Sequence, residues 1–415
     1  MAPRRIRVEQ LAEALPAGGL TWLQACSGES PLIRDGLVAA GEALGAMTFT
    51  GIFVSGLNRL DYALTGTRRV KTFFMTPELS QAKGRVEFLP LCYRDILSVL
   101  HESRIDAALM SVSPPDRSGL CSFGSVVDFL VDLWPKIPSR IAHVNARMPT
   151  TAGYSGIPFS QLTAVIEGDA ELPISAPGAD EVADKIGAAI AGLIPDGATV
   201  QAGLGRIPET AVASLRNHQK LSIHSGLIGD SVVELIEAGA LRRHSPVTAG
   251  VAIGTRRLYD AISDQAFRFR PASYTHSHRV ISQIDNLFTI NSAIEVDLFG
   301  QAFAELRPGG FVSGPGGASD FAAGGRGGGG LRIVALPATA DQGAVTRIVG
   351  PGEVSGPVSL GRFDTDVIVT EFGAAELRGK SYDERADALM AIAAPRHQAY
   401  LAEAWRTWRR AAMKQ

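Results

Sequence analysis

Cysteine is scarce in this 415-residue chain, and the three cysteines form no motif. Cys26, Cys92 and Cys121 lie far apart and include no Cys-x-x-Cys pair, so the sequence predicts neither a disulfide framework nor a zinc site. Sparse, unpaired cysteines are typical of proteins that fold in a reducing compartment. We therefore expect a cytoplasmic protein that binds no metal.

The chain also lacks long apolar runs and a surplus of charge of either sign. No apolar run is long enough to span a bilayer, and the arginines near the start precede no apolar core or cleavage site. We therefore expect neither a membrane partner nor a signal peptide. Forty basic and 42 acidic residues give a formal net charge of −2. Nucleic-acid binders usually carry a basic surplus, so this balance argues against nucleic acid as a partner and favours an enzyme.

The length and the pattern of apolar segments predict two α/β domains. The chain is too long for one ordinary core, and 46% hydrophobic residues suffice to bury more than one. Short β-rich runs alternate with helical stretches over residues 17–165, and a second alternation begins at Ala198. The polar segment 168–182 carries two prolines and marks a boundary. We predict domains at 1–175 and 176–415, each with a parallel or mixed sheet covered on both faces.

The periodicity predicts individual elements as well. Predicted strands are Met47–Val54, Val70–Met75, Val86–Leu89, Ala107–Val112, Arg140–Val144, Phe288–Ile290, Leu331–Leu336 and Val367–Thr370. Predicted helices are Ser30–Leu44, Tyr93–Glu102, Val126–Leu133, Glu181–Leu193, Glu209–Leu215, Tyr382–Ala393 and Tyr400–Lys414. In Asn291–Leu298, carboxylates at Glu295 and Asp297 alternate with apolar residues, which predicts a half-exposed strand with a solvated acidic face.

The segment Leu221–Leu235 predicts a strand-to-helix junction of the kind at which ligands bind and catalytic residues lie. An apolar strand, Leu221–His224, runs into a turn and then a helix. Asp230 is predicted to cap the start of this helix, and Gly239 to close it in the left-handed conformation. In open α/β sheets, ligands bind outside the carboxyl ends of the strands, where such strand-to-helix turns lie.

Glycine is concentrated in two further segments. The turn Gly203-Leu-Gly205 stands between a strand and a helix, where either an anion site or plain tight-turn geometry would account for it. The segment from Pro308 to Gly317 interleaves glycine with apolar residues and precedes a buried-looking strand. Here we expect glycine to let the backbone approach a ligand, rather than to form a disordered linker.

Taken together, several segments resemble the acetyl-CoA hydrolase/transferase family, the single-chain class I CoA-transferases such as acetate and 4-hydroxybutyrate CoA-transferases. The matching segments run in the family's order over nearly the whole chain. They are SGES at 27–30, VSPPDRSGLCSFG at 112–124, VNARMP at 144–149, QAGLGRIPETAVASL at 201–215, LIGDSVVELIEAG at 227–239, NSAIEVDLFGQ at 291–301, SGPGGASDF at 313–321 and VTEFGAAELRGKS at 369–381.

The resemblance implies two tandem open α/β domains of the CoA-transferase type, with the active site at their interface and two copies in a homodimer. Coenzyme A, as the acyl-CoA substrate, would thread the cleft. The residues that the resemblance places at the acyl group or at the thioester oxygen are Gly203, Gly205, Asn291, Gly314, Gly316 and Gly317. Glu371 and Lys380 match positions near the CoA-binding region, where Lys380 would either face a phosphate or lie solvated on the surface.

One position departs from the family pattern where the chemistry would be. The family reads His-Ser/Thr-Glu at the turn, and that glutamate attacks the acyl-CoA; this chain reads His224-Ser225-Gly226. Glycine has no side chain with which to attack, so transfer through a glutamyl-CoA intermediate is not expected from this position. The candidates for the missing role are His224 as general base, Ser225 as nucleophile and Glu305 as a replacement carboxylate.

Each candidate also has a structural interpretation, which is favoured for Glu305 and Glu295. A smaller departure is Ala394, where the family often has histidine before a proline. Three functions stay open: an acyl-CoA enzyme that hydrolyses, transfers directly or performs carbon–carbon chemistry; a conventional CoA-transferase whose carboxylate comes from Glu305 or from a glutamate-bearing paralogue; and a non-catalytic CoA or acyl-CoA binder. A small carboxylic acid or another acyl acceptor is the expected second substrate of the enzymes.

Overall fold

The computed structural model describes residues 2–82, 84–154, 156–176 and 178–412. In these ranges its largest sheet has eight strands, all parallel, in the order β1-β10-β8-β6-β2-β3-β4-β5. They are β1 (Arg4–Arg5), β2 (Leu20–Leu23), β3 (Thr48–Gly51), β4 (Arg69–Thr72), β5 (Val86–Phe88), β6 (Ala107–Val112), β8 (Ser139–Val144) and β10 (Ala164–Glu167). Every residue of the central strand β6 is buried, as expected for a parallel sheet covered on both faces.

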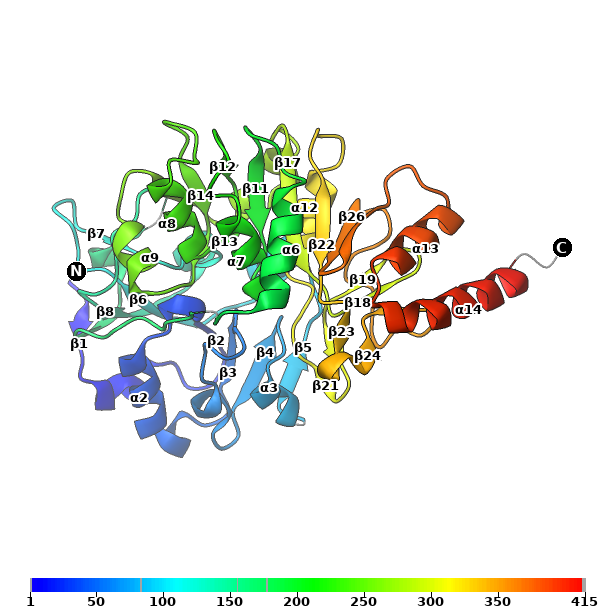
Figure 1. Ribbon diagram of the computed structural model, residues 1–415. Coiled ribbons are helices and arrows are strands. Elements are labelled where there is room, and N and C mark those ends of the chain that lie inside the picture. Colours follow the sequence, from blue (N-terminus) through cyan, green and yellow to red (C-terminus); the bar gives the residue numbers. More distant parts are fainter. Residues whose placement is uncertain (1, 83, 155, 177, 413–415) are drawn as a thin grey trace.

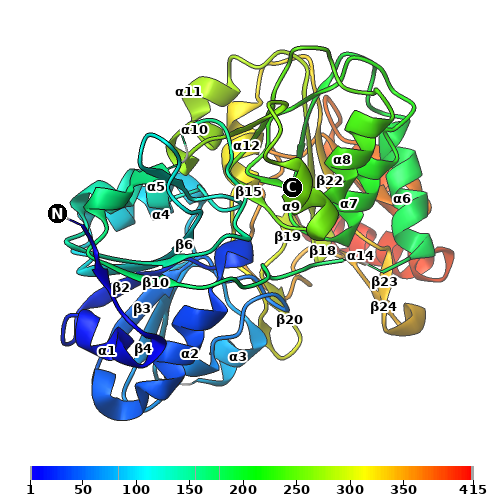
Figure 2. The ribbon, with the colours of Figure 1, turned by 90° about the vertical axis from the view of Figure 1, so that its left-hand side faces the viewer.

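A second sheet of six strands follows, in the order β12-β11-β17-β22-β26-β27. Its strands are β11 (Thr199–Ala202), β12 (Ser222–Ile223), β17 (Leu287–Ser292), β22 (Arg332–Ala335), β26 (Val367–Thr370) and β27 (Gly373–Glu376). All pairs are parallel except β26 with β27, so the carboxyl ends of β11, β12 and β17 share one edge. Figures 1 and 2 show the two sheets as neighbouring parts of one body, with the last helix extending away from it.

Helices surround both sheets. In the first half they are α1 (Leu11–Ala14), α2 (Pro31–Ala39), α3 (Pro77–Gln81), α4 (Tyr93–Glu102) and α5 (Leu130–Leu133). In the second half they are α6 (Glu181–Ala191), α7 (Arg206–Ala213), α8 (Asp230–Glu237), α9 (Arg256–Ala261), α10 (Ala272–Thr275), α11 (His278–Ile281), α12 (Ala318–Gly324), α13 (Tyr382–Ala391) and α14 (Pro395–Ala412). Among the described residues, no helix is both long and apolar enough to cross a membrane.

The predicted elements are largely present, and three ranges agree to the residue: α4, β6 and β26. The strands of the two large sheets come from residues 4–167 and 199–376, respectively. The domain limits 1–175 and 176–415 themselves stay a prediction, and residue 177, inside the predicted boundary segment, lies outside the described residues. So does Lys414, the predicted end of the last helix.

Two predicted segments differ from the structure. The helix predicted at Val126–Leu133 is reduced to α5, because Asp128 has a φ of +27° and Val127 donates its amide to Gly250 of the second half. The acidic face predicted near Glu295 is buried. Asp297 accepts hydrogen bonds from the amides of Phe299 (3.0 Å) and Gln301 (2.9 Å), and Glu295 from Ser355, so neither carboxylate is solvated.

The Leu221–Leu235 segment forms the predicted strand, turn and helix, with a short strand β13 (Leu227–Ile228) inserted before α8. Asp230 does not cap this helix, because its carboxylate accepts from the amide and the hydroxyl of Thr255, both at 2.7 Å. The helix start is held instead by Glu209, which accepts from the Ser231 amide at 2.7 Å. Gly239 has a φ of +72°, as predicted for the end of α8.

Candidate active site

A cavity of about 370 Å³ lies between the two halves of the chain, at the carboxyl ends of β11 and β17. The first half contributes Ile52–Ser55, which follow β3, together with Phe74 and Tyr93. The second half contributes Gln201–Leu204 and Gly226. The cavity therefore occupies the place in the fold at which open α/β sheets bind ligands.

The imidazole of His276 fills the space beside Gly226. A Cβ atom added at Gly226 would lie 2.6 Å from His276 Cε1 and 2.7 Å from Nε2, and one added at Gly317 would lie 2.3 Å from Nε2. Cβ atoms do not approach other heavy atoms so closely, and neither glycine has a positive φ. The ring therefore occupies the space that a side chain at either position would need, and at neither position does the backbone demand glycine.

Aromatic rings hold His276 in this position. The ring of Tyr93 stacks on it at a centroid distance of 4.1 Å, and Phe321 meets it edge-on at 4.9 Å. The Nδ1 atom lies 3.0 Å from the hydroxyl of Thr275, and only 4% of the side chain is exposed. Burial, with a smaller contribution from nearby His224, lowers the pKa of His276 to about 3. The imidazole is therefore neutral at physiological pH.

The other predicted site residues at this turn are buried and bonded, and they do not line the cavity. His224 bonds through Nε2 to the carbonyl of Thr275 at 3.1 Å, which ties the turn to the segment that carries His276. Burial lowers its pKa, and the Thr275 carbonyl partly offsets this effect. The hydroxyl of Ser225 donates to the carbonyl of Ala202 at 2.9 Å and thereby links the turn to β11.

Glu305 lies between two cavity-lining residues along the chain, but it does not line the cavity itself. Its neighbours Ala304 and Arg307 line the cavity, whereas Glu305 is buried and accepts at Oε1 from the Ser359 hydroxyl at 2.8 Å. Its Oε2 atom has no hydrogen-bond partner among the described residues. Burial raises the pKa of this carboxyl, and the bond from Ser359 partly offsets the rise. Glu305 is therefore not among the lining residues of the cavity, and its predicted role stays a prediction.

Most of the glycines predicted beside the acyl group do line the cavity. Gly203, Gly314, Gly316 and Gly317 do so, as does Asn291. Their positions follow from the fold, because Gly203 directly follows β11, Asn291 lies in β17 and the glycine loop precedes α12.

Besides His224, Ser225 and Glu305, three further predicted residues are absent from the cavity lining. Gly205 lies at the start of α7 with a φ of +127°, so glycine serves the turn there. Glu371 accepts from the amide of Ala338 at 2.8 Å, and Lys380 lies near the start of α13. The Gly203 amide donates to the carbonyl of Ile290 at 2.8 Å, so it is not free to bind an oxygen of the substrate.

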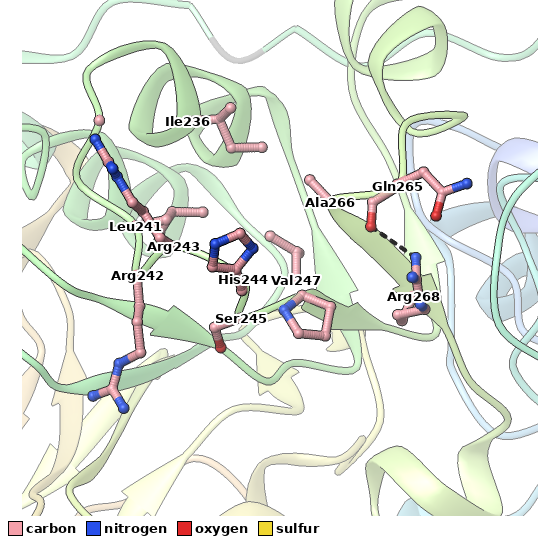
Figure 3. Close-up of a pocket in the computed structure, with 12 residues that line it drawn as sticks. Ile236, Leu241, Arg242, Arg243, His244, Ser245, Val247, Gln265, Ala266 and Arg268 are labelled. Atoms are coloured by element: carbon pink, nitrogen blue, oxygen red, sulfur yellow. Dashed lines mark hydrogen bonds between the residues drawn. The ribbon is translucent and has the colours of Figure 1, made fainter.

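A second hollow, of about 560 Å³, shares no lining residue with this cavity (Figure 3). It opens where β14 (Val247–Ala249) and β16 (Phe267–Phe269) begin, and the basic side chains of Arg242, Arg243 and Arg268 surround it. Because it lies at the amino ends of strands, it is separate from the cavity beside Gly226.

Among the described residues, no group of three or more His, Cys, Asp or Glu side chains is placed to hold a metal ion.

Sequence reasoning did not identify His276, Tyr93 or Phe321 as site residues. His276 follows a helix of one turn, and no motif in the segment Ala272–Ile281 distinguishes it. The only signal is that Gly226 and Gly317 both lack side chains, and it becomes meaningful only once the fold brings the two glycines to either side of one ring.

Comparisons with known proteins agree with this geometry. Residues 254–405 match the acetyl-CoA hydrolase/transferase C-terminal domain. The 4-hydroxybutyrate coenzyme A transferase of Clostridium kluyveri is 36% identical over 324 residues, covering 75% of this chain and 76% of that protein. The structure of RipA from Yersinia pestis superposes with a TM-score of 0.88 at 27% identity, covering 98% of this chain and 97% of RipA.

A 4-hydroxybutyrate CoA-transferase from Porphyromonas gingivalis superposes with a TM-score of 0.79 at 28% identity, covering 98% of both chains. These structures confirm the predicted α/β fold of the CoA-transferase type. The chain therefore belongs to the acetyl-CoA hydrolase/transferase family, whose members are enzymes that act on CoA thioesters.

Proposed function

We propose that this enzyme hydrolyses an acyl-CoA in the cavity by direct attack of water, without a glutamyl-CoA intermediate. One observation carries the proposal: the space that a glutamate at position 226 would need holds the imidazole of His276. A covalent route needs a carboxylate that reaches the thioester. Glu295 and Glu305 are both buried against serine hydroxyls, and neither lines the cavity.

The remaining parts of a thioester site are retained. The loop Gly314–Gly317 lines the cavity, and Gly317 lies across the His276 ring from Gly226. We propose that a backbone amide of this loop binds the carbonyl oxygen of the thioester. Attack on a thioester builds negative charge on that oxygen, and one preorganised donor stabilises it by about 3 kcal/mol. The cavity therefore supplies binding and stabilisation of the transition state, but no attacking side chain at Gly226.

The lining favours an uncharged acyl group. Inside the cavity lie the apolar side chains of Ile52, Phe53, Val54, Met75 and Val251. Arg307 is the one lysine or arginine among the described lining residues, and it is exposed to solvent. A free carboxylate at the far end of the acyl group would therefore lose its hydration inside the cavity without gaining a buried basic partner.

Mass spectrometry of the pure chain with a panel of acyl-CoAs tests this proposal. The panel pairs butyryl-CoA with succinyl-CoA, which have equal chain lengths and differ by a carboxylate, and each is incubated with and without acetate. We expect free CoA, released faster from butyryl-CoA, and no acetyl-CoA. Formation of acetyl-CoA would contradict the absence of transfer, and CoA binding without either product would favour a non-catalytic binder.

A second candidate function is conventional CoA transfer through Glu305. The unpartnered Oε2 atom of this buried carboxyl favours it, because such an atom is costly to retain without a use. The Glu305→Gln variant separates the two functions, since it removes the nucleophile while keeping size and shape. Loss of acetyl-CoA formation in that variant would support Glu305, whereas unchanged release of free CoA supports hydrolysis.

A further inference from the structure

We infer that His276 acts as the general base that takes a proton from the attacking water; this inference rests on the proposed hydrolysis. Its Nε2 end lies between Gly226 and Gly317, and all three residues line the cavity. The described residues offer no hydrogen-bond partner for Nε2, whereas Nδ1 lies 3.0 Å from the Thr275 hydroxyl. A buried ring nitrogen at the cavity surface thus stays available to a ligand.

The proposed base needs a proton on Nδ1 and a lone pair on Nε2. The hydroxyl of Thr275 lies 3.3 Å from the carbonyl of Pro271, to which it donates, and 3.0 Å from Nδ1 of His276. In the tautomer that we propose, the hydroxyl oxygen accepts from Nδ1–H, and the lone pair on Nε2 faces the cavity. The ring cannot easily turn away, because Tyr93 and Phe321 pack against it. This is the arrangement that a general base requires.

The chemical step balances with water as the only co-reactant. Water oxygen bonds to the thioester carbon, one water proton passes to Nε2, and the carbonyl electrons move onto oxygen. The carbonyl then reforms, the carbon–sulfur bond breaks, and the CoA sulfur takes the proton back from Nε2. The products are a carboxylic acid and free CoA, and His276 returns to its neutral form. The negative charge on the intermediate favours the protonated imidazole while it lasts.

Two substitutions separate proton transfer from a structural role. His276→Ala is expected to lower kcat for hydrolysis by about 10²-fold, the lower end of the range for a general base, because a pKa of about 3 makes this imidazole a weak base. His276→Gln is expected to lower kcat similarly, because an amide fills the space and forms hydrogen bonds but does not take the proton. The dissociation constant for CoA should stay unchanged in both variants. Near-normal kcat in His276→Gln would overturn the inference and indicate a structural role.

Chemical rescue distinguishes proton transfer by His276 from a purely structural role, because the rescued rate depends on the basicity of the added compound only if a proton is transferred. Added imidazole should restore part of the hydrolysis by His276→Ala, and azoles of similar size but lower basicity should restore less. Equal rescue by all azoles would overturn proton transfer by His276. The matched control is His101→Ala, which removes an exposed histidine on α4, outside the cavity, and should leave hydrolysis unchanged.

The outcomes also distinguish this inference from the function on which it rests. Release of CoA by the wild-type chain with an unchanged rate in His276→Ala would overturn the role of His276 alone. Failure of the wild-type chain to release CoA from any thioester would overturn both. Nitrogen-15 NMR of labelled histidine adds a test without turnover, using an acyl-CoA analogue with a methylene group in place of sulfur. The Nε2 signal of His276 should move when this analogue binds, and a signal that does not move would overturn the inference.

Discussion

Substitutions at Gly226 and His276 should be strongly coupled. In Gly226→Ala, the new Cβ atom would lie 2.6 Å from His276 Cε1, and Tyr93 and Phe321 pack against the ring and oppose its displacement. Overpacking of this kind costs about 1–3 kcal/mol. In the His276→Ala background the same methyl group meets no ring, and its cost should fall close to zero. The interaction energy between the two sites is then about 1–3 kcal/mol.

Thermal unfolding of wild type, both single variants and the double variant measures this coupling. Gly226→Ala should lower Tm by about 2–12 °C, from about 2–4 °C for each kcal/mol in domains of 150–250 residues. The same substitution in His276→Ala should lower it much less. Equal effects of Gly226→Ala in both backgrounds would refute the conclusion that the imidazole occupies the space beside Gly226.

The coupling also governs any attempt to install the family's glutamate. Gly226→Glu alone should be destabilised and form no adduct, because its side chain and the imidazole compete for one space. Gly226→Glu combined with His276→Ala opens that space, and should give a glutamyl-CoA thioester that borohydride traps. An adduct in the single variant would mean that the ring moves aside readily, contrary to the packing observed.

Three further predictions concern charge and hydrogen bonding. Burial by itself would raise the pKa of Asp366, but bonds from Arg332 and Arg378 outweigh it and hold the pKa well below its usual range. As pH falls, the Asp366 carboxylate is therefore protonated in the unfolded chain before it is protonated in the folded chain. The ion pairs of Asp366 thus stabilise the folded state fully above about pH 4, and this stabilisation is lost progressively as pH falls further. Asp366→Asn should cost about 3–5 kcal/mol at neutral pH in chemical unfolding, with a gap to wild type that narrows in acid; a gap independent of pH would contradict this. In the pH profile, kcat/KM for hydrolysis should show no acid limb near pH 6.5, because burial lowers the pKa of His276 to about 3. The titratable groups facing it are uncharged there too, since burial raises the pKa of Tyr93 and lowers that of His224, so a limb near pH 6.5 would contradict the environment described. Ser225→Ala should cost about 1 kcal/mol through the lost bond to the Ala202 carbonyl and should still hydrolyse; complete loss of hydrolysis would identify Ser225 as a nucleophile.

Local patterns were sufficient to predict much of the fold. The predicted and observed ranges of α4, β6 and β26 are identical, because the pattern of apolar residues that defines each element lies within a few neighbouring residues of the chain. The prediction failed where a partner lies far along the sequence. Asp230 was assigned as a helix cap, but its carboxylate binds Thr255, 25 positions away.

The candidate site was predicted only in part, for the same reason. The glycines and Asn291 of the cavity lie in sequence motifs, which made them predictable. His276 is positioned by contacts with Tyr93 and Phe321, and no pattern in the sequence indicates those contacts. The absence of a side chain at Gly226 was visible in the sequence. That an imidazole fills the space became visible only in three dimensions.

Hydrolysis in water enriched in oxygen-18, with the intact protein weighed at the same time, tests the central claim most directly. Direct attack predicts one oxygen-18 atom in the released carboxylic acid from a single turnover, and no CoA-sized increase in the mass of the protein. A CoA adduct on the protein, or an acid that has gained no oxygen-18, would contradict the claim that this enzyme acts on the thioester without a covalent intermediate.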